Sequence, residues 1–374
     1  MIGGVGAYTA ALADALARAG VEAAVLTSVN AQPVTAGRVP VHPLVGRWDA
    51  RAWQQILHMA HSTAADWVHV QYQTAAFAMN PTLNLVARGR GFKLAWTYHD
   101  LLDAYLFPKA GARLRRWTTE RPAARADLVI VTNEGDRQRL ARATRNLHTI
   151  PIGSNIAGVR LAEPARREVR STYGFGDNDL LLGYFGFLNR SKGADVLIAA
   201  LDLLVKAGTN AHLLMIGDRL GASDPTNAST LAEFEAAVAA AGLAARVQWA
   251  GRLDDAAAGA ALNAVDLLVL PFADGASLRR GTLMAGLANG CAIVTTEPQQ
   301  PLPELVDGRD LCYAPPANPA ALAAAIAGLA ADPERRERLR TAARACSAQF
   351  GWDAIAQAHL ALYAAETAAR GPAA

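Results

Sequence analysis

The sequence predicts an α/β protein made of two doubly wound domains. Short apolar runs without polar alternation, such as VDLLVLPF (265–272), are typical of strands that are buried on both faces of a parallel sheet. Alanine-rich segments of helical period, such as AYTAALADALARAG (7–20), separate these runs along nearly the whole chain. At 374 residues the chain is longer than one hydrophobic core usually supports, so two domains are expected.

The strands and helices alternate in the same way in both halves. In the first half we expect strands at 21–28, 66–72, 92–99 and 126–132, and in the second half at 180–187, 211–218, 245–251, 265–272 and 291–296. The segment 153–179 interrupts the pattern because it is charged and rich in turn-forming residues. It is predicted to be the linker and first surface segment between the domains. The stretch 350–366 has the pattern of one amphipathic helix.

The first residues lack an expected element. GGVGAYTAAL (3–12) has the pattern of a turn and helix that follow a first β-strand, yet only Met1 and Ile2 precede it. Because the first strand of a doubly wound sheet is central, we expect that a strand is missing at the N-terminus of this sequence.

Composition restricts the classes of function. The chain is 52% hydrophobic and 18% charged, and its net charge of +3 is too small to indicate nucleic acid as the main partner. The three cysteines, Cys291, Cys312 and Cys346, show no spacing typical of metal ligands or of a disulfide framework. No apolar run is long enough to span a bilayer and no signal peptide is visible, so a soluble cytoplasmic protein is expected.

Two basic turns indicate an anion site in the second half. Open α/β sheets bind ligands beyond the carboxyl ends of their strands. In GFLNRSKGADVLIAAL (186–201), Gly186 permits a sharp turn, and Arg190 and Lys192 precede a helix that is expected to begin near Gly193.

The second basic turn lies in GASLRRGTLMAGLANG (275–290). Arg279 and Arg280 precede Gly281 at another expected helix start, where unpaired N–H groups favour an anion. Ser277 and Thr282 are candidate phosphate ligands or helix caps only. Either turn alone is more simply a solvated basic loop, but the pair at one sheet edge predicts a diphosphate site.

Other strand ends carry weaker signals. Asp218 in MIGDRL and Arg252 in WAGRLDD could border a nucleoside, or serve as a cap and a surface charge. In TYHDL, His99 could face a ligand as a hydrogen-bond donor or proton carrier, or be a satisfied structural histidine. HVQYQ (69–73) adds His69, Gln71 and Gln73, which line the same cleft or pack in the core.

The first half also contains a basic segment and a glycine-rich turn. Residues 108–127 carry six Lys and Arg side chains around Trp117, and could contact an anionic membrane, hold an anionic acceptor or form a solvated face. GGVG (3–6) does not match GxGxxG, so no nicotinamide site is predicted. No Ser-His-Asp triad, Walker loop or metal-ligand cluster is visible.

These segments, in this order, resemble the retaining glycosyltransferases of the glycogen-synthase-like "group 1" family, which have the GT-B architecture. The likeness runs almost end to end and depends on GGVGAYTAALADALARAGVEAAVLT, TYHDL, IPIGSN, GFLNRSKGADVLIAAL, LLMIGD, VQWAGRL, VDLLVLPF, LANGCAIVTT, LPELV and FGWDAIAQAHLALY. It implies two Rossmann-like domains with an interdomain cleft. Residues 1–155 would form the acceptor domain, 156–349 the donor domain, and 350–374 a helix that crosses back to the first domain.

The resemblance also implies roles for residues. The loop with Arg190 and Lys192 would bind the diphosphate of a nucleotide-sugar donor, and Arg252 and Leu253 would contact its base. The glycine loop with Gly4 and Gly6 would approach the phosphates. His99 would lie near the transferred sugar.

The family needs no metal or other cofactor, because cations and helix dipoles neutralise the leaving diphosphate. The resemblance therefore implies a nucleotide-sugar donor, a carbohydrate or lipid-linked acceptor, and no nucleic acid. Independently of the resemblance, residues 108–127 could be a peripheral contact with the inner face of the membrane.

Two departures from the family pattern affect the expected site. Phe187 stands where the family usually has an arginine, and Arg190 could replace that charge. Ser277 and Ala285 stand where the family has two glutamates that contact the sugar and the ribose. A non-catalytic sugar-nucleotide binder, or a nucleotide-sugar epimerase on the same fold, are therefore the alternatives to a transferase.

Overall fold

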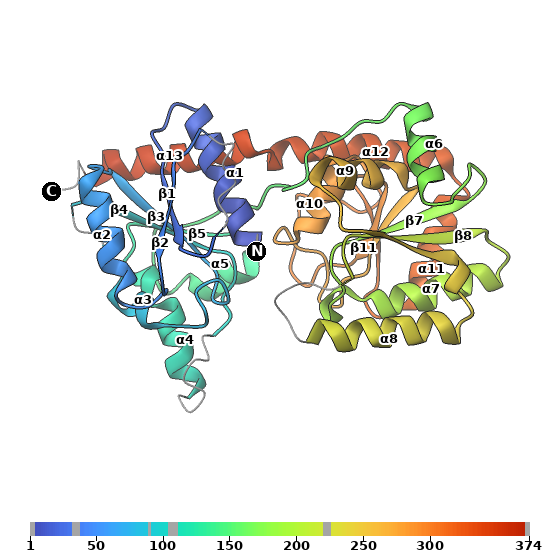
Figure 1. Ribbon diagram of the computed structural model, residues 1–374, viewed down its shortest axis with the longest axis horizontal. Coiled ribbons are helices and arrows are strands. Elements are labelled where there is room, and N and C mark those ends of the chain that lie inside the picture. Colours follow the sequence, from blue (N-terminus) through green and yellow to red (C-terminus); the bar gives the residue numbers. More distant parts are fainter. Residues whose placement is uncertain (1–3, 32–37, 89–90, 104–110, 220–225, 371–374) are drawn as a thin grey trace. The chain divides into compact units, whose positions relative to one another are not determined.

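The computed structural model describes residues 4–31, 38–88, 91–103, 111–219 and 226–370. The chain divides into two compact units (Figure 1): Met1–Gly153 together with Gly351–Ala374, and Ser154–Phe350. Each unit consists of parallel strands covered by helices, so the α/β class and the doubly wound domains predicted from the sequence are confirmed.

The strands of the first unit form two parallel sheets in the described part of the chain. One has the order β1-β2 and the other β3-β4-β5-β6. Their bounds are β1 Val25–Ser28, β2 Val41–Val45, β3 Trp67–Tyr72, β4 Lys93–Tyr98, β5 Leu128–Val131 and β6 Leu147–Thr149. Every residue of β4 is buried, as expected for a strand covered on both faces. The additional strand expected before α1 stays a prediction.

The helices of the first unit cover both faces of the larger sheet. They are α1 Gly4–Arg18, α2 Ala52–Ser62, α3 Thr82–Val86, α4 Ala112–Glu120, the 3₁₀ turn η1 Arg121–Ala124, α5 Glu134–Leu140 and α13 Trp352–Arg370. Helices α1 and α13 lie side by side (Figure 1), and their Leu12 and Ile355 share a core with Ile130 of β5. On the other face, Trp53 and Ile56 of α2 pack in a core with Trp96. The last helix of the chain is therefore part of the first unit's core.

The second unit contains one parallel sheet of strand order β12-β11-β10-β7-β8-β9. The bounds are β7 Leu180–Phe185, β8 Ala211–Ile216, β9 Val247–Gly251, β10 Leu267–Leu270, β11 Ile293–Thr296 and β12 Cys312–Ala314. The first and fourth strands, β7 and β10, are neighbours, and the chain proceeds outward from them in opposite directions. A doubly wound sheet binds ligands where the strand order reverses in this way.

Helices cover both faces of this sheet as well. They are α6 Glu163–Thr172, the turn η2 Arg190–Lys192, α7 Ala194–Lys206, α8 Thr226–Ala240, the turn η3 Ala244–Arg246, α9 Asp255–Ala264, α10 Gly281–Ala288, α11 Pro319–Ala330, α12 Pro333–Ser347 and the turn η4 Ala348–Phe350. Figure 1 shows α7, α8 and α11 on one side and α9, α10 and α12 on the other. Leu197 and Leu201 of α7 and Ile326 of α11 are fully buried against the strands.

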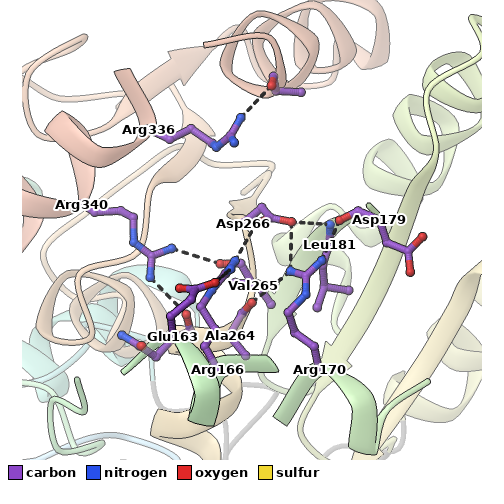
Figure 2. Close-up of polar contacts among 12 residues, drawn as sticks. Glu163, Arg166, Arg170, Asp179, Leu181, Ala264, Val265, Asp266, Arg336 and Arg340 are labelled. Carbon is purple, nitrogen blue, oxygen red and sulfur yellow. Dashed lines mark hydrogen bonds and ion pairs between the residues drawn. The ribbon is translucent and has the colours of Figure 1, made fainter. Parts of the chain in front are cut away.

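An ion-pair cluster joins the amino-terminal ends of β7 and β10 (Figure 2). Asp266, just before β10, accepts hydrogen bonds from Leu181 N (2.8 Å), Arg166 (2.6 Å) and Arg170 (3.0 Å). The side chain of Arg170 is only 2% exposed, and it also donates to the carbonyls of Gly176 and Asp179. The cluster holds β7 to β10 at the end opposite to the ligand-binding edge.

Candidate functional site

The two basic turns predicted from the sequence follow β7 and β10, the two strands at which the strand order reverses. The first turn leaves β7 at Gly186, whose φ of +102° favours glycine. It continues through η2, where Asn189 caps the turn by accepting a hydrogen bond from Ser191 N (2.7 Å). The neighbouring strands β8 and β9 also end at glycines of positive φ, Gly217 (+124°) and Gly251 (+73°).

The two turns pack directly against each other. A Cβ atom on Gly193 would overlap the carbonyl oxygen of Pro271, which follows β10. Ala273 N donates a hydrogen bond to Ser191 O (2.9 Å), and this bond joins the second turn to the first. The glycine at 193, with φ +65°, therefore permits both the sharp bend and the close approach.

Lys192 and the start of α10 meet above Gly186. A Cβ atom on Gly186 would lie 2.5 Å from Lys192 Nζ and 3.0 Å from Thr282 Cγ2, so a side chain at this position would displace both. Burial, and then the charge of nearby Arg280, lower the pKa of Lys192 to about 8. Among the described residues, no hydrogen bond or ion pair is found for the Lys192 ammonium.

The second turn places Arg280 at the helix start. Arg280 is the residue before α10, and no side chain caps the helix there. Its guanidinium is 4.7 Å from the centre of the Phe272 ring, pairs with Asp274 and lies 3.4 Å from Ser191 Oγ. Two cations and an uncapped helix N-terminus therefore lie together beyond the β7 and β10 ends, an arrangement that suits an anion.

Other predicted residues of the second unit lie apart from this group. Arg190, whose side chain is 77% exposed, pairs with Glu233 of α8 at 2.8 Å. Arg279 is exposed and lies 3.4 Å from Asp274, and Ser277 Oγ accepts a long hydrogen bond of 3.4 Å from Arg279 N.

Three predicted residues follow β8 and β9 of the same sheet. Asp218 and Arg252 are exposed after β8 and β9, and Leu253 is partly buried. Asp218 Oδ1 accepts a hydrogen bond from Arg219 N (2.8 Å), as a local cap does.

In the first unit, His99 follows β4 and is held by its neighbours. His99 Nε2 and Gln71 Oε1 are 2.9 Å apart, and the imidazole is 4.5 Å from the Tyr8 ring. Burial, and then the charge of His359, lower the pKa of His99 to about 4. The imidazole is therefore neutral at neutral pH, which favours hydrogen bonding over transfer of a resident proton.

His69 is a satisfied core residue. Its Nδ1 lies 2.5 Å from Tyr363 Oη and its Nε2 lies 2.7 Å from Thr97 Oγ1. Gly4 and Gly6 lie at the start of α1 and are exposed, and a Cβ atom at either position would meet nothing within 4 Å. Gly3 lies outside the described residues.

The described part of the basic segment, residues 111–127, contains α4 and η1 and lines one side of a groove, and Lys109 lies outside the described residues. Leu114 and Trp117 of α4 are 53% and 47% exposed, and Arg121 lies over the Trp117 ring at 4.8 Å. The adjoining groove, of about 490 Å³, is lined by residues 123–127 and 141–145, which include Arg125, Arg142 and Arg145. In the described part of the chain, no helix is both long and apolar enough to cross a bilayer.

Residues that the sequence reasoning did not place in the site are Phe272, Ser191 and Tyr184. Tyr184 of β7 is buried, and its hydroxyl has no hydrogen-bond partner among the described residues. The Arg280 charge acts on Tyr184, although burial dominates and raises its pKa. Their proximity to Arg280 is a matter of tertiary packing, and no signal in the sequence indicates it.

Comparison with protein families decides the assignment. The family model described as "Glycosyl transferases group 1" matches residues 179–332, and the model described as "Glycosyltransferase Family 4" matches residues 2–157. The chain belongs to the group 1 glycosyltransferases. This confirms the family predicted from the sequence, and the fold is the GT-B architecture of two Rossmann-like domains.

Individual relatives agree with this family. A D-inositol 3-phosphate glycosyltransferase of Xylanimonas cellulosilytica is 27% identical over 267 residues, which is 67% of this chain and 60% of that protein. The match thus spans less than two thirds of the relative's length.

Solved structures show the same fold over nearly the whole chain. HepE of Anabaena, in complex with UDP and glucose, has a TM-score of 0.75 at 17% identity, over 98% of this chain and 97% of that one. A glycosyltransferase from Rickettsia africae has a TM-score of 0.78 at 15% identity, with 98% and 96% covered. Sucrose-phosphate synthase of Thermosynechococcus elongatus has a TM-score of 0.73 at 20% identity, with 98% and 94% covered.

Proposed function

We propose that this glycosyltransferase moves a sugar from a nucleoside-diphosphate sugar to a carbohydrate or lipid-linked acceptor, with retention at the anomeric carbon. The observation that carries the proposal is the meeting of Lys192 and the uncapped start of α10 above Gly186, with Arg280 at that helix start and in contact with Ser191. Positive groups at this place suit a diphosphate better than a neutral sugar or a nucleobase.

Each residue of this group has a chemical role in the proposed reaction. The sugar–phosphate bond breaks as charge develops on the departing diphosphate. Lys192 Nζ and the Arg280 guanidinium stabilise this charge, and the N–H groups of Gly281 and Thr282 add the helix N-terminus. Because these groups are held in place before the reaction, no metal is needed in this proposal.

The remaining predicted residues keep narrower proposed roles. Arg252 and Leu253 follow β9 and contact the base, as the resemblance implies. His99 contacts the transferred sugar, and its neutral imidazole does so through a hydrogen bond. Arg190 assists with the diphosphate only if it leaves Glu233, so its contribution is smaller than that of Lys192.

A specific observation supports the alternative of a non-catalytic binder. The family's two glutamate positions are occupied by Ser277, which is partly buried, and Ala285, which is buried in α10. Neither residue has a carboxylate. The nearest carboxylate on the described part of this turn, Asp274, is engaged by Arg279 and Arg280. The function test must therefore separate binding from turnover.

The test is a panel of UDP-, GDP- and ADP-sugars incubated with the full chain, with and without carbohydrate and lipid-linked acceptors. We expect one donor to release its nucleoside diphosphate in an acceptor-dependent way and in the presence of EDTA. NMR of the product should show the anomeric configuration of the donor. Binding of a donor without turnover would establish the non-catalytic binder, conversion of the donor sugar without transfer would establish the epimerase, and failure to bind any donor would refute all three.

We also propose that the segment 108–127 contacts the inner face of the membrane. Exposed Leu114 and Trp117 lie three residues apart on α4, and Arg113 and Arg116 are exposed beside them. Apolar side chains flanked by arginines are typical of helices that lie at an anionic bilayer surface.

A further inference from the structure

Arg280 is a charged side chain that links the two basic turns. It starts in the second turn and reaches Ser191, the residue before Lys192, with a distance of 3.4 Å between Nη1 and Oγ. Only 15% of its side chain is exposed. The Arg280 guanidinium is therefore a nearly buried cation whose position decides how much positive charge lies beside Lys192.

Asp274 makes the closest polar contact to that guanidinium. It pairs with Arg280 Nη2, whereas the contact to Ser191 is long and the Phe272 ring offers only a cation–π interaction. An arginine side chain has many rotamers, and a single weak contact does not hold it in one of them. The carboxylate of Asp274 is thus the group that fixes where Arg280 points.

We infer that Asp274 is a positioning residue that holds Arg280 beside Lys192 as the second phosphate-binding cation of the site. This inference rests on the proposed function, because it assumes that the site takes a diphosphate. It assigns the second cation to Arg280 rather than to Arg190, which reaches away to Glu233. Phe187, 47% exposed, supplies no charge at the position where the family usually has an arginine.

The charge balance of the site is compatible with this role. Lys192, Arg279 and Arg280 supply three cations, and Asp274 pairs with both arginines. Asp195 of α7, whose charge acts on Tyr184, is a second carboxylate near the site, so a net positive charge remains for the diphosphate. The Asp274 carboxylate is shared between both arginines and does not neutralise either one fully. Tyr184, the other titratable group beside Arg280, remains protonated because burial raises its pKa.

The test is a double-mutant cycle that measures the affinity for UDP, GDP or ADP, whichever the wild-type chain binds, with inorganic pyrophosphate as a second probe. We expect Arg280→Ala to weaken binding of the nucleoside diphosphate about 30-fold and Asp274→Ala to weaken it about tenfold, with little effect on the nucleoside. In the Arg280→Ala background, Asp274→Ala should cause no further loss, because Asp274 acts only through Arg280.

A pH profile provides a readout that a merely structural role would not change. Asp274 holds beside Lys192 the Arg280 charge that lowers the Lys192 pKa, so release of Arg280 in Asp274→Asn should move the upper pH limit of diphosphate binding to higher pH by about half a unit. Asp274→Glu should restore most of the affinity. Arg167→Ala is the matched control. Arg167 lies on α6 and forms an exposed ion pair with Asp177, so its loss should change neither the affinity nor the pH profile.

Two other outcomes would overturn the positioning role of Asp274. If Asp274→Ala weakens binding equally with and without Arg280, or strengthens it, the positioning role is wrong while the diphosphate site remains. If the wild-type chain binds neither a nucleoside diphosphate nor pyrophosphate, the proposed function and this inference are both wrong. Melting temperatures and the control variant show whether a loss comes from unfolding.

Discussion

Lys192 has a charge that the folded site tolerates at a cost. Its pKa is lowered to about 8, chiefly by burial, whereas the pKa of a lysine in an unfolded chain is about 10.4. Between these values the unfolded chain retains a proton that the folded site has lost, so stability rises with pH in this interval. Below pH 8 the folded protein holds an ammonium in a position that disfavours it, which is typical of a group kept for binding.

This cost leads to a prediction about ligand affinity. Because the diphosphate requires the ammonium, its affinity should fall as pH rises above about 8, approaching tenfold for each pH unit. We expect Lys192→Met to lose most diphosphate affinity and to raise the free energy of unfolding at pH 7 by about 1 kcal/mol. Calorimetric titration between pH 7.5 and pH 9.5 measures the first effect, in a range where the free ligand's phosphates stay ionised.

The control for this prediction is Lys206→Met. Lys206 lies in the same unit on α7, where its exposed side chain pairs with Asp202 at 2.6 Å. It should leave affinity and pH profile unchanged. A flat profile up to pH 9.5, or an equal loss for the nucleoside, would show that Lys192 does not bind the phosphates.

At this scale the sequence predicts residue types better than side-chain directions. Arg190 and Lys192 are both predicted as phosphate ligands from their place before a helix, but only Lys192 reaches over Gly186. Arg190 pairs with Glu233, which is 43 residues away in the chain. No local pattern could indicate this, because the pairing depends on where α8 packs.

The elements show the same division between local pattern and tertiary contact. All of the strands predicted from apolar runs are present within a few residues, such as β7 at 180–185 for the predicted 180–187. The strands β2 (VHPLV), β6 (LHT) and β12 (CYA) were not predicted, because none of them contains a continuous apolar run of four or more residues. The predicted linker 153–179 contains α6 and the nearly buried Arg170. The charge of this segment indicated a surface position, yet Arg166 and Arg170 pair with Asp266 at the amino-terminal edge of the sheet.

The pairing of α6 with the sheet makes a stability prediction. Asp266→Asn leaves the Arg170 guanidinium buried with no carboxylate, so it should destabilise the second unit by about 3 kcal/mol. The pKa of Asp266 is lowered even though burial alone would raise it, because Arg170 and then the Leu181 N–H and Arg166 favour the charged form. Its contribution is therefore present above the unfolded pKa of about 3.9 and is lost as pH falls through the lower folded value.

Hydrogen exchange of peptides that cover β7 and β10 measures this effect for the second unit alone. Asp202→Asn, which removes an exposed pair with Lys206, is the matched control and should cost at most about 0.5 kcal/mol. If Asp266→Asn accelerates hydrogen exchange no more than the control does, the cluster in Figure 2 does not hold these strands together.

For the whole molecule, apolar periodicity and length were sufficient to predict two doubly wound units. The strand order β12-β11-β10-β7-β8-β9 then brings the carboxyl ends of β7 and β10 together, although Phe185 and Leu270 lie 85 positions apart in the sequence. This order explains why two basic turns from distant parts of the chain form one site. The charge of each turn is visible in the sequence, but their direct packing through Gly193 and Pro271 is not.

The first unit has an exposed surface that is both apolar and basic, and this surface leads to a prediction about membrane binding. The first unit presents Leu114 and Trp117 on a basic helix beside the arginine-lined groove, and each arginine near an anionic surface contributes about 1 kcal/mol. We therefore expect the full chain to sediment with phosphatidylglycerol-containing vesicles, less so at high salt, and only weakly with phosphatidylcholine vesicles.

The double variant Leu114→Ser, Trp117→Ser should reduce this binding about tenfold, since it removes the apolar contacts and leaves every arginine in place. Leu203→Ser is the matched control. Leu203 is a leucine of similar exposure (42%), but it lies on α7 of the second unit and outside the proposed membrane contact. Vesicle binding that depends on salt but not on Leu114 and Trp117 would show that the arginines alone attract the protein. Equal binding to neutral vesicles would contradict the proposed membrane contact altogether.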